Sequence, residues 1–291
     1  MKIGLSGLFI GGVFIWGGLA IAKIDVHGHR GARAVLPENT LVAFEEALDA
    51  GVDYLELDTG VTKDNVVVVT HDQYINSDIC QYESGARVEK KIPIYSLTFE
   101  ELKKFDCGSL KNKKFPMQSP KPGQKIPTLA EVFDLVQKSS KQQAKTVQFN
   151  IETKIEIENP GLAPTPEEFV RLVMSVVNKY GFGSRTVLQS FDFRTLKAVR
   201  GLEPTIRISA LVEKNFPSLI KIAREVRPDF ISPDQSLLTQ KYVNELHKLN
   251  VKVAPWTVNK AEDWKKLISW GVDGIITDDP RELIAYLKNN K

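Results

Sequence analysis

The amino-acid sequence predicts an α/β fold of the (β/α)8 TIM-barrel class. Short apolar segments with strand character alternate with amphipathic helical segments from residue 24 onward, and eight such strands can be counted. Strict alternation indicates parallel strands joined by right-handed crossovers, and eight units favour a closed barrel over an open sheet. The length of 291 residues fits one barrel of about 250 residues with a short leader. No Gly-x-Gly-x-x-Gly turn follows the first strand, which argues against a nucleotide-binding sheet.

The barrel strands are expected where β-branched and other apolar residues are concentrated in short runs. Buried parallel strands have this composition because both faces of the sheet are covered. The expected bounds are 24–28, 53–58, 146–152, 186–190, 206–211, 229–232, 252–256 and 274–277.

Amphipathic helices are expected between these strands. In the segment 40–50, Leu41, Phe44 and Leu48 recur at helical spacing, so one face of the segment is apolar. Pro280 stands where proline is favoured, in the first turn of a helix, and it starts the last one. The other helices are expected at 167–180, 218–227, 240–249 and 261–270, and the last runs from 280 to 287.

The β-branched run 66–70 interrupts the alternation. Too few residues separate it from the second strand for a crossover helix, so we expect a β-hairpin. A two-residue turn at Asp64-Asn65 would place Asp58 directly opposite His71 in the ladder. Directly opposed residues share a face of the sheet, with Cβ atoms roughly 5 Å apart.

Residues 73–124, after the second barrel strand, are expected to form an insertion on the rim of the barrel. The stretch is rich in Pro, Gly, Lys and Ser, and it has one clear helical segment at 98–105. Long insertions in a compact domain are often lids or substrate-binding loops. Cys80 and Cys107 both lie in it, and we expect a disulfide between them in an oxidising compartment, with two buried free thiols as the alternative.

The N-terminus has the composition of a secretory signal peptide. A single lysine precedes an uncharged run over residues 3–22, which ends in a small-x-small pattern. We expect cleavage after Ala22, which makes 1–22 a leader and 23–291 the barrel domain. The alternative is an uncleaved anchor, because about 20 apolar residues can span a bilayer. We therefore expect a periplasmic or secreted bacterial protein, or a membrane-anchored one if the leader is retained.

The charge balance does not indicate a nucleic-acid partner. The formal net charge is +3 and the isoelectric point is about 8.6, whereas a nucleic-acid-binding domain concentrates basic residues on one face. Membrane contact is expected only through the leader or a lipid substrate. The sequence gives no indication of an oligomeric state.

Acidic residues lie where two of the strands end, and active sites of (β/α)8 barrels are built at these strand ends. Glu56 and Asp58 are two positions apart, so they project from the same side of the second strand, and Glu152 ends the third. Three converging carboxylates repel one another unless a cation lies between them, and oxygen ligands suit Mg²⁺ or Ca²⁺. The alternative is a set of solvated acids, which the apolar neighbours of Glu56 and Glu152 make less favourable.

Histidines and basic residues join this acidic cluster at neighbouring strand ends. His29 and His71 are expected to flank the metal site, where two imidazoles suit general acid and base catalysis near neutral pH. Arg30 and Lys154 either neutralise the carboxylates or hold a phosphate group. Trp256, near the end of the seventh strand, is a further candidate contact for substrate. A hard cation, two imidazoles and two fixed positive charges together predict phosphodiester cleavage.

Five sequence blocks, in order along the chain, resemble the glycerophosphodiester phosphodiesterase family. The opening block is His29-Arg30-Gly31-Ala32 with residues 37–40, and the further blocks lie at 56–72, 150–154, 256–259 and 271–278. The match runs from residue 29 to residue 280, which is nearly the whole chain after the leader. Asn65 replaces the common turn glycine of the family, which is acceptable because Asn tolerates left-handed backbone geometry.

The resemblance implies a reaction, a cofactor and a role for each candidate residue. Members hydrolyse substrates such as glycerophosphocholine or glycerophosphoethanolamine to glycerol 3-phosphate and an alcohol. One divalent cation is implied, with Ca²⁺ favoured over Mg²⁺ because exported bacterial members tend to be of the calcium-dependent type. The acid–base pair, the cation ligands and the phosphate contacts of the family correspond here to His29 and His71, to Glu56, Asp58 and Glu152, and to Arg30 and Lys154.

The sequence leaves the details of the reaction open. It does not assign the base to one histidine or the other, and the nucleophile is either water or the 2-hydroxyl of the substrate. Two other functions are alternatives: a lysophospholipase D-type lipid phosphodiesterase, and a non-catalytic barrel that binds a phosphate headgroup. The second is expected to lack a histidine or a carboxylate of the site, and here every position is filled.

Overall fold

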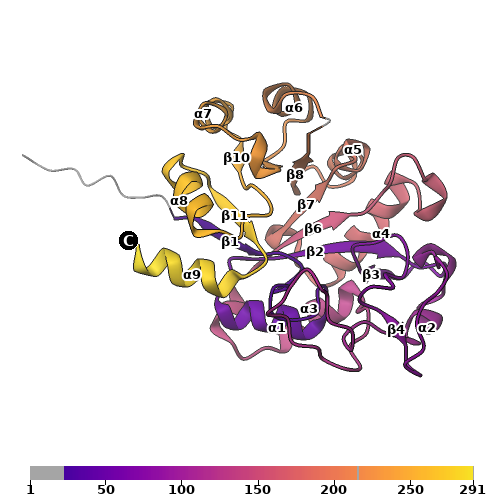
Figure 1. The fold of residues 1–291 in the computed structure, drawn as a ribbon. Coiled ribbons are helices and arrows are strands. Elements are labelled where there is room, and N and C mark those ends of the chain that lie inside the picture. Colours follow the sequence, from indigo (N-terminus) through magenta and orange to yellow (C-terminus); the bar gives the residue numbers. More distant parts are fainter. Residues whose placement is uncertain (1–22, 215, 291) are drawn as a thin grey trace, which may run out of the picture.

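Eight parallel strands surround the axis of the computed structural model, which describes residues 23–214 and 216–290 (Figure 1). Ladders of hydrogen bonds connect them in the order β10-β9-β8-β7-β6-β2-β1-β11. Two backbone hydrogen bonds link the ends of this sheet, from Asp273 N to Val253 O and from Ile276 N to Pro255 O, so the predicted (β/α)8 barrel is confirmed. The barrel strands are β1 (Asp25–Gly28), β2 (Tyr54–Val61), β6 (Gln148–Thr153), β7 (Thr186–Ser190), β8 (Arg207–Val212), β9 (Phe230–Pro233), β10 (Lys252–Val253) and β11 (Gly274–Thr277).

Each barrel strand is followed along the chain by a helix, and the helices lie around the strands (Figure 1). Every residue of β2 is buried, as expected for a parallel strand covered on both faces. The predicted helices omit α3 and α5, although Thr128 and Glu131 form a capping box at the start of α3. The helices are α1 (Leu41–Ala50), α3 (Leu129–Lys138), α4 (Pro166–Lys179), α5 (Phe193–Leu202), α6 (Leu219–Val226), α7 (Gln240–Lys248), α8 (Ala261–Ser269) and α9 (Pro280–Asn289).

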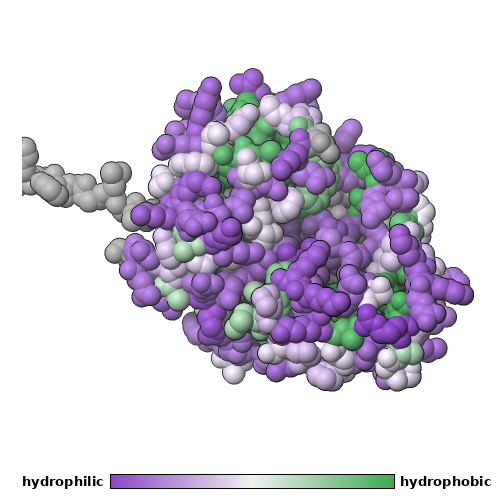
Figure 2. All heavy atoms as spheres, viewed as in Figure 1, coloured by the Kyte–Doolittle hydropathy of each residue, from purple (hydrophilic) through white to green (hydrophobic). Residues whose placement is uncertain are grey.

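The surface drawn in Figure 2 is mostly hydrophilic, with apolar side chains exposed in separate patches. Met117 and Ile157 are the most exposed large apolar side chains among the described residues, at 77% and 63%. Single exposed apolar residues are normal on a soluble domain.

The hairpin after β2 has a different register from the predicted one. Strand β3 (Val67–Val69) pairs with β2 so that Thr59 lies opposite Val69, and Asp58 therefore faces Thr70 instead of His71. The prediction of a two-residue turn was wrong because the turn holds three residues, and it closes with a bond from Thr62 N to Val66 O.

Side-chain chemistry explains the longer turn. The Thr62 hydroxyl accepts a hydrogen bond from Val66 N at 3.0 Å and donates one to Asp64 Oδ1 at 2.6 Å. Asn65 has a left-handed backbone conformation, with φ 62°. This agrees with its position in the turn, where the resembling sequences commonly have glycine. These local bonds stabilise a wider loop, and they shift the ladder by one residue.

The insertion has a small core of its own beside the barrel. Strand β4 (Gln81–Tyr82) pairs with β5 (Phe105–Asp106), and the predicted disulfide between Cys80 and Cys107 joins the segments next to them. Helix α2 (Phe99–Leu102) is shorter than the predicted 98–105 because Phe105 is buried in the β4–β5 ladder. A 3₁₀ turn, η1, spans Ile94–Ser96. This core contains Ile75, Cys80, Val88, Ile94, Leu102, Phe105 and Cys107 of the insertion, together with Val68 of β3 and Ile126.

Removing the disulfide is expected to destabilise the protein. The bond closes a loop with a sequence separation of 27 residues, and cross-links of this kind contribute roughly 2–4 kcal/mol by restricting the unfolded chain. We expect the double variant Cys80→Ala/Cys107→Ala to lose that much free energy of unfolding in urea titrations. Wild-type protein treated with a thiol reductant should show the same loss, and an unchanged midpoint in both samples would contradict the prediction.

Lys23, the first described residue, lies at the amino ends of the barrel strands. Its ammonium group pairs with Asp53, just before β2, and lies 3.6 Å from the Asp25 carboxylate at the start of β1. The carboxyl ends of the strands, with the predicted site, are at the opposite end of the barrel. The predicted leader, 1–22, lies outside the described residues. None of the helices in the described part of the chain is long and apolar enough to cross a membrane.

Candidate active site

Three carboxylates from two adjacent strands meet at the carboxyl end of the barrel. In the ladder between β2 and β6, Asp58 lies opposite Glu152, and Glu56 precedes Asp58 by two positions on the same face. One oxygen atom of each of the three carboxylates lies within 4.8 Å of the others. All three side chains are buried, so their charges are poorly screened by water.

Glu56 is held by hydrogen bonds from both sides. Arg30 N donates to Glu56 Oε2 at 2.9 Å, and Gln189 Nε2 donates to Oε1 at 2.7 Å. Burial raises the pKa of Glu56 well above its ordinary value, and the charges of Asp58 and Glu152 raise it further. This carboxylate is therefore costly to ionise until a positive charge joins it.

A tight turn after β1 aims the Arg30 amide at Glu56. Arg30 has a left-handed backbone conformation, with φ 52°, and Gly31 follows with φ 85°. A Cβ atom on Gly31 would lie 2.6 Å from the carbonyl carbon of Ala43, so the turn requires glycine at this position. Gly31 of the His-Arg-Gly motif is therefore needed for the shape of the turn, whereas His29 and Arg30 supply polar groups to the site.

Asp58 stays ionised in spite of its burial. Burial alone would raise its pKa, but the charges of Arg30, His71 and Lys154 bring the pKa well below its ordinary value. Asn39 Nδ2 donates to Asp58 Oδ2 at 2.9 Å, and Arg30 Nε lies 3.1 Å from the same oxygen. The other oxygen, Oδ1, is buried and has no hydrogen-bond partner among the described residues.

The acidic cluster fits a divalent cation. An oxygen spacing of 4.8 Å or less lets one ion contact all three carboxylates at about 2.3–2.6 Å, the usual Ca²⁺–oxygen distance. The unpartnered Asp58 Oδ1 supplies a lone pair that an ion would use. Ligands made only of carboxylate oxygens suit hard cations such as Ca²⁺ and Mg²⁺.

His29 is fixed by a carboxylate behind it. Its Nδ1 lies 2.7 Å from Asp278 Oδ1, and its Nε2 lies 4.0 Å from Glu56 Oε2. Burial and then the Arg33 charge lower the pKa of His29 to about 4, against the opposing effect of Asp278. The ring is neutral at pH 7 with Nδ1–H donating to Asp278, which leaves the lone pair of Nε2 toward the acidic cluster.

Asp278 is itself held by two further donors. Arg33 Nε donates to its Oδ1, and Asn259 Nδ2 donates to its Oδ2 at 2.7 Å. Burial raises the pKa of Asp278, but the hydrogen bond from His29 and the Arg33 guanidinium outweigh this effect, so the net direction is downward. Asp278 is thus a permanent anion that orients the His29 ring.

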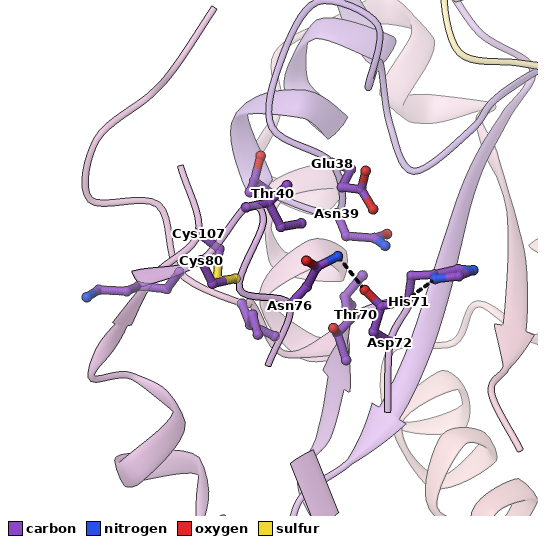
Figure 3. Close-up of a pocket in the computed structure, with 13 residues that line it drawn as sticks. Glu38, Asn39, Thr40, Thr70, His71, Asp72, Asn76, Cys80 and Cys107 are labelled. Carbon is purple, nitrogen blue, oxygen red and sulfur yellow. Dashed lines mark hydrogen bonds and ion pairs between the residues drawn. A yellow bond between two sulfur atoms is a disulfide. The ribbon is translucent and has the colours of Figure 1, made fainter. Parts of the chain in front are cut away.

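His71 has a similar arrangement on a more exposed segment. Its Nδ1 lies 2.8 Å from Asp72 Oδ1, and Asn76 Nδ2 donates to the other oxygen of Asp72 at 2.6 Å. Figure 3 shows this chain from Asn76 through Asp72 to the His71 ring. The His71 side chain is 33% exposed, compared with 10% for His29. His71 still reaches the cavity although the hairpin register differs from the predicted one, because β3 ends at Val69, before His71.

One cavity of about 260 Å³ contains these groups. Lys154 Nζ lies in it, 2.8 Å from Glu152 Oε1 and 3.8 Å from Asp58 Oδ1. Trp256 lines it too, with its indole N–H fixed to Ser232 O at 2.8 Å. Seven of the eight predicted site residues line this cavity, and the eighth, Asp58, lies next to two of them, Arg30 and Lys154. These seven are His29, Arg30, Glu56, His71, Glu152, Lys154 and Trp256.

A family model described as the glycerophosphoryl diester phosphodiesterase family matches residues 29–282. The chain belongs to this family. Two relatives bear the name glycerophosphodiester phosphodiesterase. That of Caldanaerobacter subterraneus subsp. tengcongensis is 34% identical over 266 residues, which are 91% of this chain and 98% of the relative. That of Bacillus subtilis (strain 168) is 31% identical over 270 residues, which are 89% and 84% of the two chains.

A solved structure also resembles this phosphodiesterase closely. It is a crystal structure from Silicibacter pomeroyi DSS-3, provisionally named a glycerophosphoryl diester phosphodiesterase. It has 30% sequence identity and a TM-score of 0.85, and the match covers 92% of this chain and 94% of that chain. The likeness thus extends over the whole barrel.

Sequence reasoning missed the residues that support the site of this phosphodiesterase. Asp278 and Asn39 lie in the matched blocks, but no role was assigned to them, and Gln189 at the end of β7 was not considered. Their positions could have indicated these roles, because active sites lie at the carboxyl ends of barrel strands. Asp278 directly follows β11, Gln189 lies near the end of β7, and Asn39 precedes α1. His27, two residues before His29, does not line the cavity: it is buried, and its ring stacks on that of Tyr54 with centroids 4.1 Å apart.

Proposed function

We propose that this enzyme hydrolyses glycerophosphodiesters to glycerol 3-phosphate and an alcohol, with a divalent cation held by Glu56, Asp58 and Glu152. Family membership makes it a phosphoric diester hydrolase. The observation that carries the proposal is the buried carboxylate cluster, with oxygens within 4.8 Å of one another, beside His29 and His71. The bound cation would offset charge on the phosphoryl oxygens.

The basic residues are proposed to bind the phosphate group. Lys154 and Arg30 both contact the acidic cluster from the cavity side, so a phosphate placed beside the cation would meet their positive charges. Burial opposes the charge on Lys154, but Glu152 and Asp58 raise its pKa, so it remains an ammonium ion. These contacts would position the diester and stabilise negative charge in the transition state.

We assign the base to His29 and the acid to His71. The neutral His29 ring has a free lone pair on Nε2, which can take a proton from the attacking hydroxyl, whether this belongs to water or to the substrate. His71 is paired with Asp72, whose carboxylate would stabilise the protonated ring. As the hydroxyl oxygen bonds to phosphorus, the bond to the alcohol breaks, and His71 donates a proton to the departing oxygen. Attack by water gives glycerol 3-phosphate directly, whereas attack by the 2-hydroxyl of the substrate gives a cyclic phosphate, which a water molecule must then open to glycerol 3-phosphate.

Metal removal tests the proposal, and Ca²⁺ is the cation that we favour. We expect a chelator to abolish release of glycerol 3-phosphate from glycerophosphocholine, because no cation would then offset the charge on the phosphoryl oxygens. Adding Ca²⁺ should restore turnover, and more of it than Mg²⁺ at equal concentration. The measurement is a coupled glycerol 3-phosphate assay, with Zn²⁺ as a further comparison. Full activity in excess chelator would contradict a cation-dependent mechanism.

Export is part of the same proposal. The predicted leader over residues 1–22 and the Cys80–Cys107 disulfide both support an oxidising compartment, either periplasmic or extracellular. The enzyme would be membrane-attached if the leader were retained.

The two alternative functions are not favoured. A headgroup-binding barrel without catalytic activity has no need for two histidines that are each backed by a carboxylate. A lysophospholipase D-type enzyme requires an apolar channel for an acyl chain, and the apolar side chains that line the cavity, Phe191, Leu211, Trp256 and Ile276, are too few to form one.

A further inference from the structure

The active-site cavity has a second wall of different chemistry. Going round the barrel in strand order, β8 is four strands from β1, so it lies across the axis from it. Leu211 near the end of β8 and Glu213 just after it line the cavity there, whereas His29 and Arg30 follow β1. The cavity is therefore basic and metal-binding on one side, and largely apolar on the other.

Aromatic rings flank Leu211 on this second side. Phe191, after β7, meets Trp256, after β10, edge to face with ring centroids 5.5 Å apart. Phe216 supports Phe191 from outside at 6.2 Å. Because the Trp256 indole N–H is also fixed to Ser232 O, the wall is formed before any substrate binds.

The rim of this wall carries one acidic group. Glu213 is exposed, and it forms no ion pair with any residue in the described part of the chain. Other acidic side chains that line the cavity, Glu56 and Glu152, belong to the cation cluster at the ends of β2 and β6. Glu213 thus gives the aromatic side a negative charge of its own.

Phe191 connects the two sides of the cavity. Its ring centroid lies 5.8 Å from Lys154 Nζ, the group proposed to hold the phosphate. A substrate with its phosphate beside Lys154 would extend its leaving alcohol along Phe191 toward Trp256 and Glu213. Aromatic faces and a nearby carboxylate are the groups that recognise an ammonium ion.

We propose that Phe191, Trp256 and Glu213 form a subsite for a positively charged headgroup, and that the enzyme selects diesters with an ammonium group over those with a neutral polyol. This inference rests on the proposed function, because it concerns the leaving alcohol of the same reaction. The charge pattern of the cavity matches a zwitterion, with the phosphate at the basic wall and the ammonium group at the aromatic wall. Quaternary ammonium groups are the best match, since aromatic rings bind them without hydrogen bonds.

The test compares two substrates in the cation-loaded enzyme. Glycerophosphocholine and glycerophosphoglycerol share the glycerol 3-phosphate half and differ in the charge of the leaving alcohol. We expect wild-type enzyme to have the higher kcat/KM for glycerophosphocholine. Replacing the carboxylate, Glu213→Gln, should lower the ratio of the two kcat/KM values about threefold to tenfold, and the charge reversal Glu213→Lys should lower it further.

A matched variant controls for the loss of an exposed carboxylate. Glu225→Gln removes one from helix α6, where it pairs with Lys221 away from the cavity, and it should leave the ratio unchanged. Equal ratios for wild type, Glu213→Gln and Glu213→Lys would overturn the subsite while the proposed function stood. Failure of wild type to hydrolyse either diester with any divalent cation would overturn the proposed function, and the subsite with it.

Discussion

The variant His29→Ala is expected to lose almost all turnover. The ring is the buried base candidate, neutral at pH 7 and oriented by Asp278 at 2.7 Å, so the variant lacks the group assigned to take the proton. Removing a general base of this kind lowers kcat by about 10²–10⁴-fold. Initial rates of glycerol 3-phosphate release at saturating substrate and cation would measure the loss.

A second histidine–aspartate pair provides the control. His247 on α7 lies 2.8 Å from Asp273 through its Nε2, and it is outside the cavity. His247→Ala should therefore retain wild-type kcat. Thermal unfolding with and without Ca²⁺ should show that the His29→Ala protein is folded and still binds the ion. Wild-type turnover in His29→Ala would show that His29 does not act as the base.

Neutralising one acid of the cluster should weaken cation binding without lowering the stability of the cation-free protein. In Glu152→Gln we expect turnover to fall by roughly 10²-fold or more, since a catalytic cation is worth several kcal/mol. The rise in melting temperature on adding Ca²⁺ should be lost as well, because one ligand no longer carries charge. Calorimetry and activity assays on the same preparation would measure both effects.

The cation-free form of the same variant should be at least as stable as wild type. Burial raises the pKa of Glu152 and the Asp58 charge adds to this, even though Lys154 acts in the opposite direction. A raised pKa means that the folded protein holds its proton more tightly than the unfolded chain does. Ionisation at neutral pH therefore costs stability, and glutamine avoids that cost.

Two other variants serve as comparisons for the stability of Glu152→Gln. Asp58→Asn should lower the stability of the cation-free protein, because the pKa of Asp58 is shifted in the opposite direction by Arg30, His71 and Lys154. Glu245→Gln on the surface of α7 should change neither stability nor cation binding. A full Ca²⁺-induced shift in Glu152→Gln would exclude Glu152 from the cation site.

The barrel and the convergence of Glu56, Asp58 and Glu152 could be predicted from the sequence because they follow from regular patterns. Buried parallel strands are continuous apolar runs, and two predicted strands, 186–190 and 274–277, have the observed bounds. Parallel strands end on one face of a barrel, so acids at the ends of β2 and β6 meet without any knowledge of the loops.

The remaining features depend on contacts that the patterns do not contain. The hairpin register followed from the hydroxyl of Thr62, whose bond to Val66 N favours a wider turn than the spacing suggested. The roles of Asp278 and Gln189 depend on side chains brought together from strands far apart in the sequence. Helix α2 ended early because Phe105 was needed in a two-stranded ladder, which is a tertiary effect.

The position of Lys23 has a consequence for substrate access. Lys23 pairs with Asp53 at the amino end of the barrel, and the cavity with the proposed site lies at the opposite end. If the leader served as a tether, the mouth would open away from the bilayer into the surrounding fluid. In that orientation the enzyme would meet dissolved, already deacylated diesters, whereas lipids still embedded in that bilayer would face the closed end of the barrel.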